Sequence, residues 1–218
     1  MKINRINMTT RTMSILVILF GAYQQFIVKS NEIIVEFHHV ILNAGALFVV
    51  TFLPSILERF KYEISPKLYS MLILSLTTSM IGGVTFKLYK RIKLLDKIVH
   101  LFNGALIAVF AFRLITMLFP NWNDKAVIVF ISAAIISIAV GTVWEIYEFV
   151  VDMLLDNNMQ RYQDVVTNEP FIGQAALYDT MFDIIADSLG AVLTALALNF
   201  SYRREGKLCN ELQIGYAK

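Results

Sequence analysis

Acidic and histidine side chains recur at helical spacing within otherwise apolar stretches of this chain. On an α-helix, which turns 100° per residue, residues three or four apart lie on the same face, so each group of them forms one stripe. Histidine nitrogens and carboxylate oxygens bind divalent metal ions, and the same groups act as general acids and bases. Three such stripes are Asp96, His100 and Asn103; Glu145, Glu148 and Asp152; and Asp179, Asp183 and Asp187.

A fourth stripe is expected near the start of the second apolar segment, if the chain is already helical there; it comprises Glu32, Glu36, His39 and Asn43. Each stripe stands at the start or the end of its segment, and under strict alternation across a membrane all four face the same side. An isolated Asp at the centre of a membrane helix costs about 2.5–3.5 kcal/mol, so the shared negative charge requires compensation. Divalent cations, shared protons or the lysines of the 87–97 loop are the options.

The composition is that of a membrane protein. Hydrophobic residues make up 57% of the 218 positions, charged residues make up 17%, and the mean hydropathy is +0.62. A spanning segment must satisfy its own backbone hydrogen bonds, and the alternation typical of barrel strands is absent, so every span is expected to be helical. The prediction is an all-α, polytopic integral membrane protein with a single domain at 1–218, spans near 13–28, 33–57, 68–86, 98–119, 126–151 and 179–200, and a polar tail at 201–218.

Several other classes are disfavoured. No patch of Lys and Arg is interleaved with aromatic residues, so the lipid bilayer rather than nucleic acid is the expected partner. The single Cys209 provides neither a disulfide framework nor a thiolate metal site. The apolar N-terminal stretch continues through Val28 with no A-x-A-like site after it, which favours a first membrane span over a cleaved signal peptide.

The distribution of basic residues predicts the orientation. With a cytoplasmic N-terminus, eleven Lys and Arg residues fall in inside loops and seven in outside loops. The positive-inside rule therefore favours cytoplasmic N- and C-termini, although the five charges of the 87–97 loop oppose it. The stripes are then extracytoplasmic. The connection at 153–178 exceeds the usual loop length, and we expect it to cover a site formed by the stripes.

Three segments carry a family resemblance: 96-DKIVHLFNGAL-106, 144-WEIYEFVVD-152 and 179-DTMFDIIADSLGA-191. They resemble the YjdF-like family of bacterial inner-membrane proteins and, more distantly, the D-K-x-x-H, E-x-x-Q and D-x-x-x-D-x-x-x-N-x-x-G-A pattern of VanZ-like membrane proteins, in which amides stand at the positions of Glu148 and Asp187. The resemblance covers about residues 87–195, implies an inner-membrane location and transfers no reaction. The positions that match the family pattern are Asp96, Lys97, His100, Glu145, Glu148, Asp179, Asp183, Asp187 and Gly190.

Three functions fit these observations. The leading hypothesis is a membrane-embedded, metal-dependent hydrolase of a lipid or lipid-linked substrate, since mixed His and carboxylate ligands suit Zn, Mn or Fe. The alternatives are a cation- or proton-coupled transporter and a non-catalytic membrane or envelope partner whose acids only pair with the 87–97 loop. The catalytic candidates are Asp96, His100, Glu145, Glu148, Asp183 and Asp187. The metal-ligand candidates are His39, His100, Glu145, Glu148, Asp183 and Asp187.

Structural roles remain open for several of these residues. Asp96 and His100 stand four residues apart, so they could simply form a hydrogen-bonded pair with a structural role instead of a metal-binding or proton-transfer role. Asp179 fits an acid that caps the N-terminus of the last helix. Chemistry is therefore expected mainly at the acids one to three turns inside their segments, which are Glu145, Glu148, Asp183 and Asp187.

Overall fold

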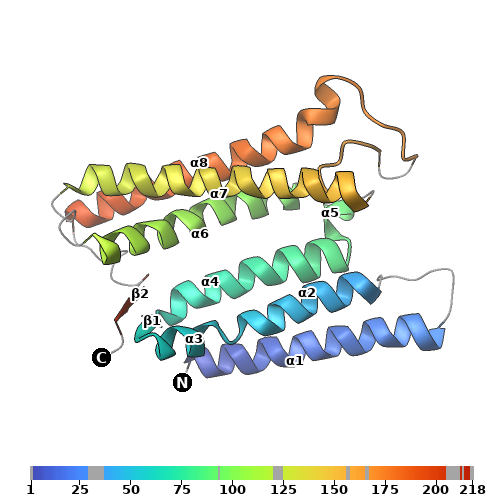
Figure 1. Ribbon diagram of the computed structural model, residues 1–218, viewed down its shortest axis with the longest axis horizontal. Coiled ribbons are helices and arrows are strands. Elements are labelled where there is room, and N and C mark those ends of the chain that lie inside the picture. The colour runs from blue at the N-terminus through green and yellow to red at the C-terminus, as the bar shows by residue number, and fades with distance from the viewer. Residues whose placement is uncertain are drawn as a thin grey trace. The chain divides into compact units, whose positions relative to one another are not determined.

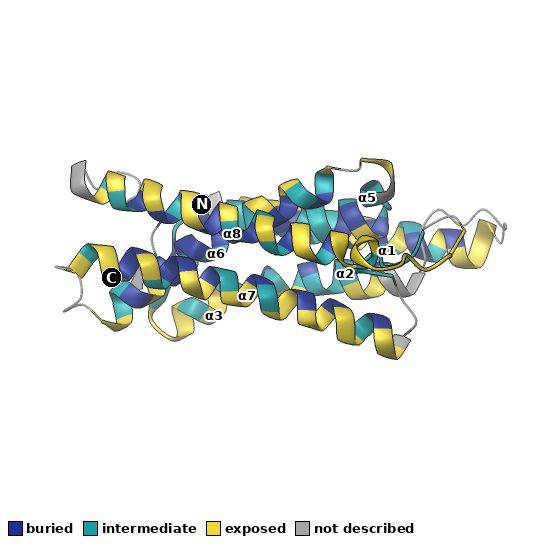
Figure 2. Ribbon diagram, turned by 90° about the horizontal axis from the view of Figure 1, so that it is seen from above, coloured by how far each residue is buried: buried dark blue, intermediate teal, exposed yellow. Residues whose placement is uncertain are grey.

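The computed structural model describes residues 2–28, 37–92, 94–119, 125–155, 158–164, 167–204, 212 and 214–216. Among them, six helical segments are long and apolar enough to cross a membrane: Ile3–Val28, Val40–Arg59, Pro66–Thr85, Leu95–Leu118, Ala126–Leu154 and Gln174–Tyr202. The prediction of an all-α protein with about six spans is confirmed. Many large apolar side chains on these helices are exposed, which is the surface that a bilayer requires. Figure 2 shows exposed residues along the helices.

The chain divides into two compact units, of which the first comprises residues 1–96 and 210–218. The boundary falls in the first turn of a helix, so Asp96 is described below with the helix to which it belongs. Whether the two units form a single domain stays a prediction. Within the first unit, the elements in chain order are α1 (Lys2–Tyr23), the π-helix η1 (Gln24–Val28), α2 (Phe37–Val50), α3 (Leu53–Arg59), β1 (Tyr62–Ile64), α4 (Pro66–Leu76), the π-helix η2 (Thr77–Thr85), α5 (Leu88–Arg91) and β2 (Ile214–Tyr216).

The apolar run of the first helix starts near residue 13, but α1 itself already begins at Lys2. Two polar side chains in its first three turns, Asn7 and Arg11, have partners within the unit. The hydroxyl of Tyr69 donates to Asn7, and Arg11 Nε donates to Thr51 Oγ1 at 2.7 Å. The Arg11 guanidinium also lies 4.3 Å from the ring centroid of Phe52, in cation–π contact.

Local sequence explains the start of α4 and the small sheet. Ser65 caps α4 by accepting a hydrogen bond from the backbone N–H of Leu68, and Pro66 follows at the first helical position, where its missing N–H costs nothing. The strand β1 precedes this cap and pairs antiparallel with β2, so that Tyr62 lies opposite Tyr216. Residues 214–216, expected as part of a polar tail, thus add one strand to the first unit.

The second unit, residues 97–209, contains three long helices: α6 (Leu95–Leu118), α7 (Ala126–Leu155) and α8 (Gln174–Arg204). Figure 1 shows them lying side by side along most of their length. Contacts pair the start of α6 with the start of α8, since Lys97 lies against Asp183 and Gly104 lies against Asp187. The Ser137 hydroxyl donates to the Gly104 carbonyl at 2.7 Å, which joins α7 to α6.

Glycines allow α6 and α8 to approach backbone to backbone. A Cβ atom added to Gly190 would collide with the backbone carbonyl of Leu101 and lie 3.0 Å from the amide nitrogen of Ala105. A Cβ at Gly104 would collide with the carbonyl of Asp187 in the same way. Small residues are the usual means of close helix packing in membranes. Gly190 is therefore a close packing point between α6 and α8, beside the acidic side chains of α8.

We expect Gly190→Ala to destabilise the protein because α6 and α8 must separate to admit the methyl group. Overpacking of this kind costs typically about 1–3 kcal/mol. The measurement is thermal unfolding in detergent. The matched control is Gly45→Ala, since a Cβ at Gly45 meets nothing within 4 Å. Equal thermal stability of the two variants would contradict the close packing of α6 and α8.

Candidate functional site

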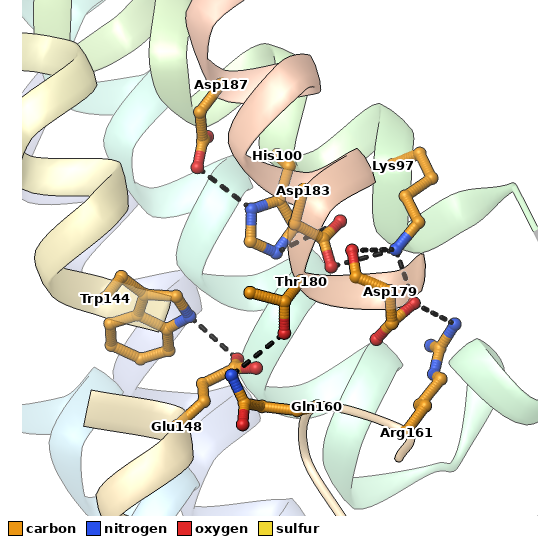
Figure 3. A network of polar contacts seen from close by, with 10 residues as sticks. All are labelled: Lys97, His100, Trp144, Glu148, Gln160, Arg161, Asp179, Thr180, Asp183 and Asp187. Carbon is orange, nitrogen blue, oxygen red and sulfur yellow. Dashed lines mark hydrogen bonds and ion pairs between the residues drawn. The ribbon is translucent and has the colours of Figure 1, made fainter. Parts of the chain in front are cut away.

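The polar stripes of α6, α7 and α8 meet at one end of the three-helix bundle. The first two turns of α6 contact the stripe of α8, and a Cβ at Gly141 of α7 would lie 2.6 Å from Asp187 Oδ2. Since α7 ends at Leu155, its acids at 145–152 lie between Gly141 and that end. The expectation that these three stripes share one end is met within the second unit (Figure 3).

Lys97 is the cation at the centre of this site. Its ammonium group lies 2.5 Å from Asp179 Oδ1 and 2.8 Å from Asp183 Oδ2, and it also approaches the backbone carbonyl of Asp179 at 3.4 Å. An ammonium has three donors, and these contacts engage all of them. The Asp183 side chain is only 2% exposed, and its ion pair with Lys97 offsets the free-energy cost of burying it as an anion.

His100 lies between two aspartates of α8. Its Nδ1 atom is 3.1 Å from Asp187 Oδ2, which is a hydrogen bond, whereas its Nε2 atom is 3.7 Å from Asp183 Oδ1. If Asp187 is ionised, it accepts the Nδ1 proton, and the lone pair of a neutral imidazole then stands on Nε2. The hydrogen bond between Nδ1 and Asp187 therefore fixes the orientation of the ring, so that Nε2 points toward Asp183.

Asp96, His100 and Asp183 form the group that could hold a metal ion. One potential ligand atom from each lies within 4.8 Å of the others, and all three residues are buried. Asp96 and His100 stand four residues apart on α6, so they project from the same face, and Asp183 completes the group from α8. The group combines one imidazole with two carboxylates. It includes two of the predicted ligands, His100 and Asp183, together with Asp96, which the sequence analysis gave only as a catalytic candidate; their ligand roles stay predictions.

Glu145 is the buried acid that lacks a protein partner. Among the residues that the structure describes, neither of its carboxylate oxygens has a hydrogen-bond partner, although the residue is 3% exposed. Its electrostatic neighbours are Glu148, Asp183, His100 and Asp179, which places its carboxyl group beside the possible metal-binding group. Burial of a carboxyl group without a partner costs free energy, so this position requires a proton or a cation.

The two other acids of α7 have different surroundings. Glu148 accepts a hydrogen bond from the Trp144 indole at 2.8 Å, one turn earlier on the same helix. Asp152 accepts from the backbone N–H groups of Met159 at 2.8 Å and Gln160 at 2.9 Å. Neither belongs to the group of three possible ligands, and Asp152 acts as an anchor for the chain that follows α7.

That chain covers the site as a strap, which we define as residues 158–164. The Gln160 amide donates to Thr180 Oγ1 of α8 at 2.9 Å and to the Glu145 carbonyl of α7 at 3.3 Å. Arg161 Nη1 lies 3.4 Å from Asp179 Oδ1. The strap thus contacts the site ends of both helices, in line with the expectation that the 153–178 connection covers the site (Figure 3).

The fourth stripe gives a different result. Glu32 and Glu36 lie outside the described residues, and although His39 is part of α2, its side chain lies outside them too. Asn43, the last member, donates to Thr85 Oγ1 of η2 at 3.4 Å, within the first unit. A metal-ligand role for His39 therefore stays a prediction.

The structure adds four residues that sequence reasoning did not include among the site candidates. Lys97 was not a site candidate, although it matched the family pattern and belonged to the 87–97 loop whose lysines were one of the options for compensating the acids. Thr180 follows Asp179 directly, but its hydroxyl gave no signal. Gln160 and Arg161 belong to a connection whose path no helical periodicity predicts, although the arginine beside an acidic site was a usable signal.

Comparisons with known proteins agree with this architecture. The model of a family described as "Predicted membrane protein (DUF2238)" matches residues 10–204. A protein of Thermotoga maritima described as "Uncharacterized protein" is 27% identical over 183 residues, which cover 83% of this chain and 85% of that protein. No solved structure matches the chain. The resemblance to a bacterial membrane family, drawn from the sequence, is confirmed.

We expect Lys97→Met to destabilise the protein strongly, because it leaves Asp179 and Asp183 without this cation. Breaking a buried ion pair on one side costs roughly 3–5 kcal/mol, and partial exposure of Lys97 places the effect toward the lower end. Thermal unfolding in detergent measures it. The double variant Lys97→Met with Asp183→Asn should recover part of the loss, and the exposed Lys67→Met serves as the control. A double variant no more stable than Lys97→Met would argue against the pairing.

Proposed function

We propose that this chain, which belongs to the DUF2238 family of predicted membrane proteins, is a membrane-embedded, metal-dependent hydrolase of a lipid or lipid-linked ester or phosphoester. The observation that carries this proposal is the orientation of His100. Its Nδ1 atom is bonded to Asp187 and its Nε2 atom faces Asp183. Metal-ligating histidines nearly always have this arrangement, in which a carboxylate behind the ring fixes the nitrogen that faces the metal.

The spacing of the possible ligand atoms supports a metal ion. At 3.7 Å, His100 Nε2 and Asp183 Oδ1 are too far apart for a hydrogen bond. Two ligands of one ion, each bound at about 2.0–2.2 Å in tetrahedral geometry, stand roughly 3.3–3.6 Å apart. A small movement of either side chain would bring both onto one ion. Asp96 supplies a third ligand, and His with carboxylates suits Zn, Mn or Fe.

The other side chains fall into distinct roles. A divalent ion held by Asp96, His100 and Asp183 would polarise a carbonyl or phosphoryl oxygen and lower the pKa of a bound water. Glu145, whose buried carboxyl group has no hydrogen-bond partner among the described residues, would accept a proton from the attacking water as general base. Asp187 would position His100, and Lys97 would offset the charge of Asp179 and Asp183. Glu148 is bonded to Trp144 and is an electrostatic neighbour of Glu145.

The depth of the site supports a lipid substrate. His100 is the sixth residue of α6, so it lies about 8 Å along the helix from its first residue. The polar interface of a bilayer occupies roughly 5–8 Å on each side of the hydrocarbon core, and the ester bonds of lipids lie there. If α6 begins at the outer edge of the interface, the group of Asp96, His100 and Asp183 lies near the level of these ester bonds.

Metal content tests the proposal. Protein purified without chelator and dialysed should retain close to one equivalent of Zn, Mn or Fe by elemental mass spectrometry. His100→Ala and Asp183→Asn should lose it, because each removes a ligand. Asp187→Asn should weaken metal affinity by about 10–100-fold while the protein stays folded, as changes behind a ligating histidine do. Glu169→Gln, at an exposed acid of the 153–178 connection, should bind metal as the parent does.

We expect Glu145→Gln to separate binding from chemistry. Because Gln keeps the shape of Glu but cannot accept the proton, the variant should retain its metal and lose about 10²–10⁴-fold in the release of products from a polar lipid extract, followed by mass spectrometry. Loss of the metal together with activity would make Glu145 a ligand instead. Protein that binds no metal, releases no product and shows ion-dependent flux in vesicles would refute the hydrolase in favour of the transporter.

A further inference from the structure

The strap of residues 158–164 is held to the bundle at two points. Both oxygens of Asp152 accept backbone N–H groups, from Met159 and from Gln160, and the Gln160 side chain reaches Thr180 of α8. These contacts tie the strap to the end of α7 and to the start of α8. The residue that follows them is Arg161, so its position is determined by a short and well-anchored stretch of chain.

The backbone at Arg161 turns the side chain back over the site. Arg161 has a φ of 49°, in the left-handed region, which residues with a Cβ adopt at a cost in free energy. Such a conformation persists where the surroundings enforce it, and here the anchored Gln160 precedes it. The guanidinium group then lies over Asp179, at 3.4 Å from Oδ1 (Figure 3).

Lys97 and Arg161 share the same carboxylate oxygen but differ in how they contact it. The three donors of Lys97 are directed onto oxygens of Asp179 and Asp183, at 2.5, 2.8 and 3.4 Å. The Arg161 contact, at 3.4 Å, is well beyond the 2.7–2.9 Å of a strong charge-assisted hydrogen bond. The contact of Lys97 with the aspartates is thus the tighter one, and the contact between Arg161 and Asp179 is the longer and weaker one.

Exposure decreases from the strap inward. The Arg161 side chain is 27% exposed, Lys97 is 21%, Asp179 is 11% and Asp183 is 2%. An anion that arrives from the interface therefore meets Arg161 before it meets the acids. Without a cation at the exposed edge of the site, the carboxylates would repel an anionic substrate. A planar guanidinium also matches two oxygens of a phosphate group, which a single ammonium does not.

We infer that Arg161 binds the phosphate group of a membrane lipid and holds it over the Asp96, His100 and Asp183 group. In the bound state the phosphate oxygens replace Asp179 Oδ1 as the partner of Arg161, while Lys97 stays on Asp179 and Asp183. The inference rests on the proposed function for its choice of a lipid, and it narrows the substrate class to phosphate-bearing lipids. It involves no covalent step.

Lipid retention tests the inference without hydrolysis. The full-length protein is released from nanodiscs of phosphatidylglycerol and phosphatidylcholine in equal amounts, in the presence of chelator, and the retained lipid is measured by native mass spectrometry. The phosphate of phosphatidylcholine is balanced by its own cation, so the parent should prefer phosphatidylglycerol. Arg161→Gln should reduce that preference by about tenfold or more, as expected for loss of a charge-assisted contact. Arg161→Lys should restore it in part.

Matched variants and a second ligand make the result decisive. Arg59→Gln, an exposed arginine at the end of α3, should keep the preference of the parent. Inorganic phosphate should displace phosphatidylglycerol only at concentrations far above those of the lipid. If phosphate alone displaces it at similar concentrations, the ligand is a free phosphate and the lipid assignment is wrong. If Arg161→Gln behaves as Arg59→Gln does, Arg161 has no such role.

The two proposals fail in different ways. Lipid retention that depends on Arg161, in protein that binds no metal, would support the phosphate-binding residue and overturn the hydrolase. Metal binding and product release that survive in Arg161→Gln, with an unchanged lipid preference, would keep the hydrolase and overturn the inference. Arg161→Gln should unfold at nearly the same temperature as the parent, since partly exposed ion pairs contribute little to stability.

Discussion

The pairing of Lys97 and His100 of α6 with the aspartates of α8 is the constraint on which the second unit depends. Asp183 and Asp187 are 2% and 3% exposed, and carboxylates so deeply buried need partners of opposite charge or hydrogen-bond donors. Those partners can reach them only if α6 and α8 nearly touch, which the glycines at 104 and 190 permit. The ion pairs therefore depend on the close packing of the two helices, because a larger residue at either glycine would separate the helices and with them the charged groups.

One acid of the site has no compensating partner in the part of the chain that the structure describes. Lys97 pairs with Asp179 and Asp183, and Arg161 pairs with Asp179. His100 and Trp144 form hydrogen bonds with Asp187 and Glu148, but Glu145 has no hydrogen-bond partner among the described residues. Buried in this way, Glu145 needs a proton or a cation. That need connects the structural role of the site to its proposed chemistry, since a buried carboxylate without a partner would favour the binding of a cation.

Sequence periodicity was enough to predict the helices and the stripes, because both follow from local spacing. Apolar runs of span length define the six membrane segments, and the i, i+4 spacing of Asp96 and His100 places them on one face whatever the rest of the chain does. Which nitrogen of His100 faces which aspartate depends on the distance and rotation between α6 and α8, and a helix wheel holds no information about either. The bond between Trp144 and Glu148 is different, since the two residues stand four apart on α7 and local spacing already places them on one face.

The strap shows why the remaining part of the site was beyond sequence reasoning. The path of the strap is determined by single hydrogen bonds of Asp152 and Gln160 rather than by a repeating sequence pattern. The spacing of residues in the sequence therefore does not predict that Arg161 contacts Asp179. Asp152 itself looked like another member of the acidic stripe of α7. Its two oxygens instead accept hydrogen bonds from the backbone of the strap, so Asp152 anchors the covering segment. A stripe of acids on a membrane helix can thus divide its members between chemistry deep in the bundle and attachment at the rim, and the division follows from what lies opposite each residue.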